Sequence, residues 1–177
     1  MGKTGWWIAA AALAAGVVVA GPGGPAPASS PALDRFKSLA GDWVAAEDGD
    51  MVKKGDLVAS YHLSAGGSAV VEELFPGMEH AMTTVYYLDG KDLVLTHYCM
   101  NGNQPHMRAK APNGSKIEFA FAGGSNIDPK TSEHMHQASF DFVSPNELKS
   151  TWTEWNQGKV SMVVNIHTVR KSGGGTN

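Results

Sequence analysis

The chain has 177 residues, a length that predicts a single domain, and a formal net charge of −3. It has no basic stretch of the kind that binds nucleic acid, so we expect no nucleic-acid partner. Only 18% of the residues are charged, and the single cysteine, Cys99, leaves no internal disulfide.

The N-terminal region reads as a targeting segment followed by a spacer. Residues 1–20 combine a short start containing Lys3, an apolar run and small residues before Gly21, the pattern of a cleaved signal peptide. The apolar run is shorter than the roughly 20 residues of a membrane span, so we expect no stable span after cleavage; an uncleaved anchor is the alternative. Residues 21–32 are rich in Gly, Pro and Ser and predict a disordered linker. We therefore expect an exported protein, periplasmic or secreted.

Residues 33–171 are predicted to form one all-β domain, followed by a flexible tail at 172–177. We expect one short helical turn before Gly41, because no longer stretch keeps a helical apolar period. Beyond it, apolar and polar residues alternate between turn signals such as Asp89-Gly90. The ten expected strands cover residues 42–48, 56–64, 68–75, 80–88, 93–100, 105–111, 115–122, 134–143, 147–156 and 159–169.

Successive hairpins of this kind predict an antiparallel meander. A meander with no helices to cover it gains most by closing, because closure removes the unpaired edges. We therefore predict a single antiparallel up-and-down β-barrel of about ten strands, with a two-sheet sandwich as the alternative. Ten strands enclose more space than side chains easily fill, so a cavity is expected.

The segment "LAGDW", residues 39–43, resembles the Gly-x-Trp motif that opens calycin barrels, the lipocalins and their relatives. The strand number is closer to the fatty-acid-binding and nitrobindin-like branch. "AGGSAVVEELFPG", "LVLTHYCMNGNQPHM" and "HMH" also resemble a group of uncharacterised secreted bacterial lipocalin-like proteins. The resemblance implies a barrel with a cavity and with Trp43 at its closed end, and it implies no reaction.

Two pairs of chemically reactive side chains stand out in the predicted strands. His97 and Cys99 are two residues apart, as are His134 and His136, so each pair shares one face of its strand. Strand direction in a meander places both pairs at the same end, an open rim. We expect both pairs to point inward, His134 and His136 together with Phe140. The long connection 123–133 spans the same rim and is a candidate lid.

This arrangement predicts a pocket for a small apolar or amphipathic molecule, with mostly apolar walls and a few placed polar groups. The candidate ligand-binding residues are His97, Cys99, Gln104, Phe119, Phe121, His134, His136, Phe140, Trp152, Glu72 and Glu154, with Phe142 a further wall residue.

Three alternatives stay open for the same residues. His97, Cys99, His134 and His136 form a ligand set suited to zinc or copper. A haem bound through a histidine is implied by the nitrobindin resemblance. Cys99 as a nucleophile would make the barrel an enzyme, but no complete catalytic motif stands out, so we prefer a binding protein. Each side chain taken singly also fits a buried structural role.

Overall fold

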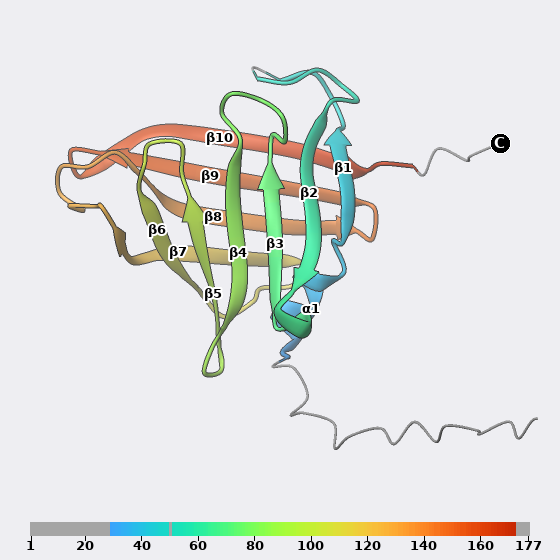
Figure 1. Cartoon of the computed structure of the whole chain (residues 1–177), viewed down its shortest axis with the longest axis horizontal. Helices are drawn as coiled ribbons and strands as arrows, with labels where there is room; N and C mark the ends of the chain where they lie inside the picture. Colours follow the sequence, from blue (N-terminus) through green and yellow to red (C-terminus); the bar gives the residue numbers. More distant parts are fainter. Residues whose placement is uncertain (1–28, 50, 173–177) are drawn as a thin grey trace, which may run out of the picture.

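The computed structural model describes residues 29–49 and 51–172, and the predicted signal peptide at 1–20 lies outside them, as do most of the linker and of the tail. Ten antiparallel strands follow one another around a closed barrel, as predicted (Figure 1). The strands are β1 (Gly41–Ala45), β2 (Leu57–Ser64), β3 (Ala69–Leu74), β4 (Met82–Asp89), β5 (Asp92–Tyr98), β6 (Gln104–Ala109), β7 (Lys116–Ser125), β8 (His134–Ser144), β9 (Glu147–Asn156) and β10 (Lys159–Arg170). β1 closes the barrel by pairing with the end of β10, from Trp43 opposite Arg170 to Ala45 opposite Thr168.

A short helix, α1 (Pro31–Lys37), precedes the barrel and begins ahead of the predicted domain start at Leu33. Ser30 caps it by accepting a hydrogen bond from the Leu33 amide, and Pro31 occupies the first helical turn, where no amide hydrogen is needed. A 3₁₀ turn, η1 (Ala65–Gly67), joins β2 to β3. No helix in the described part of the chain is long and apolar enough to cross a membrane.

Helix α1 seals one end of the barrel and fills the space behind it. Figure 1 shows α1 at the end where the β2–β3 connection lies. Its Phe36 side chain is fully buried and stacks on Tyr86 with 4.1 Å between ring centroids. Phe119, Phe140 and Phe142 meet Phe36 edge-on at centroid distances of 5.9, 5.1 and 5.4 Å. These aromatic contacts make the core of the sealed half.

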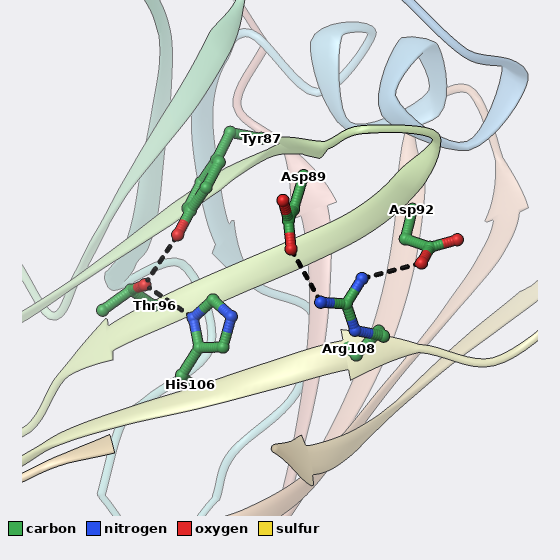
Figure 2. A network of polar contacts seen from close by, with 6 residues as sticks. All are labelled: Tyr87, Asp89, Asp92, Thr96, His106 and Arg108. Carbon is green, nitrogen blue, oxygen red and sulfur yellow. Dashed lines mark hydrogen bonds and ion pairs between the residues drawn. The ribbon is translucent and has the colours of Figure 1, made fainter. Parts of the chain in front are cut away.

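Strand β5 has the two faces that its alternation predicts. Leu93, Leu95 and His97 are buried. Thr96 faces the outer surface, where its hydroxyl contacts His106 Nδ1 at 3.2 Å and the Tyr87 hydroxyl at 3.4 Å (Figure 2). His106 therefore lies near the open rim but belongs to an outer network, not to the interior.

Strand β8 departs from simple alternation at a bulge. Met135 pairs with Glu154 and Gln137 pairs with Thr153, so His136 is an extra residue without a partner on β9. A bulge of this kind reverses which residues of a strand face inward. Met135 therefore points inward on the same side as Ala138, nearer the open end. The sequence predicts His134 and His136 in that position.

Candidate functional site

An apolar pocket of about 230 Å³ lies at the end of the barrel where β5 and β9 finish and β8 and β10 begin. It is smaller than the roughly 300–1,000 Å³ typical of sites for drug-sized ligands. Its lining residues are Met51, Leu74, Phe75, His80, Met82, His97, Cys99, Met100, Asn101, Glu133, Met135, Trp152, Glu154, Met162, Val164 and Ile166. The wall is dominated by aliphatic, aromatic and thioether groups, with a few polar groups among them.

His97 is the most deeply placed polar group of the pocket. Its side chain is 1% exposed, and its Nδ1 atom lies 2.9 Å from the Thr84 hydroxyl oxygen. Burial lowers the pKa of His97 to about 4, so the imidazole is neutral at physiological pH. The other ring nitrogen, Nε2, is buried and has no hydrogen-bond partner. An unpaired buried nitrogen of this kind favours binding of a group that supplies the missing hydrogen bond.

A second buried polar group lies beyond Thr84. Glu72 is fully buried, and it accepts hydrogen bonds from Tyr61 and Tyr86 at 2.5 and 2.6 Å. Burial raises the pKa of Glu72, and hydrogen bonds from Tyr61, Tyr86 and Thr84 partly offset that rise. The Thr84 hydroxyl and His97 Nδ1 form one hydrogen bond, and His97 Nε2 is left unpaired.

Two further nitrogens in the pocket lining have no partner. Trp152 lies 4.9 Å from His97 between ring centroids, and its Nε1 atom is buried and unpaired. His80 Nε2 is unpaired as well, beside the Phe75 ring at 4.9 Å. Three of the five unpaired buried side-chain atoms in the described part of the chain therefore belong to this pocket.

An acidic corner completes the lining. Glu154 on β9 is 5% exposed and accepts a hydrogen bond from Ser161 at 2.8 Å. Glu133, from the connection before β8, is exposed, and the hydrogen bond and negative charge of Glu154 raise its pKa. Burial raises the pKa of the Cys99 thiol, with smaller contributions from Glu154 and Glu133. Cys99 and the two carboxyl groups therefore share one corner of the pocket.

His134 and His136 do not line this pocket, although the sequence predicts them among its residues. His134 Nε2 contacts His136 Nδ1 at 3.0 Å, and His134 Nδ1 contacts the Ser132 carbonyl oxygen at 2.8 Å. The His136 ring stacks on Trp155 at 3.8 Å and on Phe121 at 5.0 Å. None of these residues lines the pocket, because the bulge at His136 turns Met135 toward it instead.

Other predicted lining residues are displaced for identifiable reasons. Phe119, Phe140 and Phe142 pack on Phe36, because α1 fills the part of the barrel interior in which the sequence predicts a cavity. Glu72 is not among the lining residues and is held by the hydroxyls of Tyr61 and Tyr86. The Gln104 side chain reaches the Gly102 carbonyl oxygen and Asn126. The predicted residues that do line the pocket are His97, Cys99, Trp152 and Glu154.

The four proposed metal ligands do not converge. His97 and Cys99 belong to the pocket, whereas His134 and His136 pair with each other under Phe121. Among the described residues, no group of three or more His, Cys, Asp or Glu side chains is arranged to hold a metal ion. The raised pKa of Cys99 also disfavours the thiolate that nucleophilic catalysis needs.

Several pocket residues were missed at the level of sequence. Met51, Phe75, His80 and Glu133 come from connections between strands, where alternation carries no information about direction. Met135 lies between His134 and His136 in the sequence, so alternation predicts it on the face opposite theirs. For Met51, Phe75, His80 and Glu133, the only signal in the sequence is their position near strand ends at the open rim.

A larger hollow of about 570 Å³ lies beside the β1–β2 connection and shares Met51, Phe75, Met162, Val164 and Ile166 with the pocket. Its other lining residues include charged and polar side chains such as Glu47, Asp48 and Lys149. None of its lining residues has an unpaired buried polar atom in the part of the chain that the structure describes. We therefore take the smaller pocket as the candidate site.

Comparison with known proteins found no family model and no curated protein that matches this chain.

Proposed function

We propose that this protein is an exported binding protein for a small apolar or amphipathic molecule, held in the pocket at the open end of the barrel. The observation that carries the proposal is an apolar pocket whose lining contains three buried nitrogens without partners, on His80, His97 and Trp152. Unpaired buried polar atoms cost free energy, about 1–3 kcal/mol each, unless a ligand or water satisfies them.

The wider assignment follows the same reasoning. The closed ten-strand barrel with Trp43 near the end sealed by α1 supports membership of the calycin superfamily. The apolar run in residues 1–20 supports export. The pocket volume favours a ligand smaller than a haem, and the scattered histidines favour an organic ligand over a metal centre.

Ethylbenzene is a suitable neutral probe, because its size matches the pocket and it has no polar group. Titration calorimetry on the wild type should show binding. Val164→Phe, which places a larger ring at a partly exposed position of the lining, should weaken that binding by about tenfold or more.

The matched control is Val143→Phe, at an exposed position of β8 that is outside the pocket lining. Its affinity for ethylbenzene should equal that of the wild type. Equal binding by wild type and both variants would place the probe elsewhere and contradict the proposal, as would no binding at all. Mass spectrometry of the exported protein under native conditions then identifies any co-purified ligand.

A further inference from the structure

The acidic corner of the pocket has no positive counterpart. Glu154 is nearly fully buried, and its side-chain hydrogen bonds are with the neutral Ser161 hydroxyl and with the other carboxyl group, Glu133. In the described part of the chain, neither Glu154 nor Glu133 forms an ion pair with Lys, Arg or His. No Lys or Arg is among the described lining residues of the pocket.

Two adjacent carboxyl groups without a cation are electrostatically costly. Buried carboxylates are normally paired or strongly hydrogen-bonded, because removing a charge from water costs several kcal/mol. Here Glu133 hydrogen-bonds Glu154, and that hydrogen bond and the negative charge of Glu154 raise the pKa of Glu133, so the two carboxyl groups share a proton. A bound cation would take the place of that proton and would offset the burial of the Glu154 charge.

The neighbouring side chains suit an organic cation. Trp152 is two residues from Glu154 on β9, and both side chains line the pocket, so the indole ring lies beside the acidic corner. Aromatic faces attract ammonium groups by about 0.5–2 kcal/mol. His97 Nε2 is unpaired in the same pocket and is free to hydrogen-bond a polar group of the ligand. The remaining wall, formed by Met82, Met135, Val164 and other apolar side chains, requires an apolar body.

We propose that the ligand is a small organic ammonium, with its charged group between Glu133 and Glu154 and its apolar body against Trp152 and the aliphatic wall. This inference rests on the proposed function, since it names the chemical class that the same pocket takes. It disfavours carboxylate ligands such as fatty acids, whose charge would add to that of the two glutamates.

Three probes of one shape test the charge directly. Benzylamine, benzyl alcohol and ethylbenzene differ only in the terminal group, which is an ammonium, a hydroxyl or a methyl. A hydrogen bond to a charged group contributes about 1 kcal/mol more than a neutral one, so benzylamine should bind about fivefold more tightly than benzyl alcohol. Ethylbenzene should bind more weakly than either.

The variant Glu154→Gln keeps the shape of the side chain and removes its charge. It should abolish the preference for benzylamine and leave ethylbenzene binding unchanged. Glu118→Gln, at a solvent-exposed side chain of β7, makes the same change in net charge at a site outside the pocket and should keep the preference. Circular dichroism confirms that both variants are folded.

A measurement on the wild type requires no substitution. The ionisable side chains in the pocket lining are Glu133, Glu154, His80, His97 and Cys99. The pKa of Glu133 is raised, so lowering the pH from about 8 to about 5 favours its neutral form and opposes a bound ammonium, whereas His97, with a pKa of about 4, stays neutral over this range. The benzylamine preference should therefore fall with pH, while the affinity for ethylbenzene stays constant.

The outcomes separate this inference from the proposed function. Benzyl alcohol binding as tightly as benzylamine, or a preference that survives in Glu154→Gln, overturns the ammonium assignment. If ethylbenzene still binds and Val164→Phe still weakens that binding, the proposed pocket is supported and only its specificity for cations is contradicted. If none of the three probes binds, the proposed function fails together with the inference.

Discussion

The Nδ1 atom of His97 lies 2.9 Å from the hydroxyl oxygen of Thr84, and the two residues face each other across β4 and β5. Thr84 in turn pairs with Glu72, which pairs with Tyr61. A buried polar row therefore crosses four strands and ends at the pocket, where the free Nε2 atom of His97 is held in one orientation.

Acid should destabilise the protein through His97. Its pKa is lowered from 6.5 to about 4, so between these values the unfolded chain binds a proton that the folded protein does not. This contribution to stability is complete above about pH 6.5 and is lost as the pH falls to about 4, amounting to about 3 kcal/mol. The free energy of unfolding of the wild type, minus that of His97→Asn, should decrease by this amount.

Denaturant titrations at several pH values measure that difference. Glu72 has a raised pKa and titrates in both proteins, so its contribution cancels in the comparison. A difference between wild type and variant that does not change with pH would show that His97 is not buried as a neutral group.

The closed end depends on Arg170. Its guanidinium lies 4.6 Å from the Trp43 ring and donates to the carbonyl oxygens of Ala40 and Ser38, each at 2.7 Å. Arg170→Lys cannot reproduce this forked geometry, so it should lower the free energy of unfolding by about 1–3 kcal/mol.

The surface residue Arg108 provides the comparison for Arg170. It contacts Asp89 and Asp92 at 2.7 Å each (Figure 2), but all three side chains are well exposed. Arg108→Lys should cost about 0–1 kcal/mol, because water screens such pairs. Equal effects of the two substitutions in thermal and chemical denaturation would argue against a special role for Arg170.

Removal of the Phe36 ring should be among the most damaging single changes. Phe36→Ala empties the aromatic core of the sealed half and should destabilise the protein by about 3–5 kcal/mol. Phe36→Leu, which keeps much of the volume, should cost clearly less. Chemical denaturation of both variants gives the values; a small loss for the alanine variant would mean that α1 does not seal the barrel in solution.

The thiol of Cys99 should react slowly. It is 9% exposed, and burial raises its pKa, so the reactive thiolate is scarce. Alkylation by iodoacetamide should be at least about tenfold slower in the folded protein than in denaturant. Bound ethylbenzene should slow it further. Alkylation at the denatured rate would instead indicate an activated thiol and revive the enzymatic alternative.

His134 and His136 should contribute to stability and not to ligand binding. The double substitution His134→Ala/His136→Ala removes the stack with Phe121 and Trp155 and should cost about 1–3 kcal/mol. Calorimetric affinities for benzylamine and ethylbenzene should stay within about twofold of the wild type. A large loss of affinity in a folded variant would show that the two histidines take part in ligand binding.

The strand order and the location of the site follow from local rules that the sequence carries. Alternation with a period of two placed all ten strands close to their observed bounds, and β9 matches at both ends. The count of strand directions places His97 and Cys99 at the open rim, where they line the pocket, and Trp152 and Glu154, also predicted to bind the ligand, line it with them.

Only the tertiary structure decides which other residues line the pocket. The bulge at His136 arises from the pairing of β8 with β9, and no local pattern marks it, so the second histidine pair turned away from the pocket. Phe36 enters the barrel because α1 packs across the end of the barrel. Phe119 and Phe140, which the sequence predicts as walls of the cavity, therefore belong to the core. Periodicity reports the direction of a side chain within a regular strand, whereas bulges, plugs and connecting segments depend on contacts between residues far apart in the sequence.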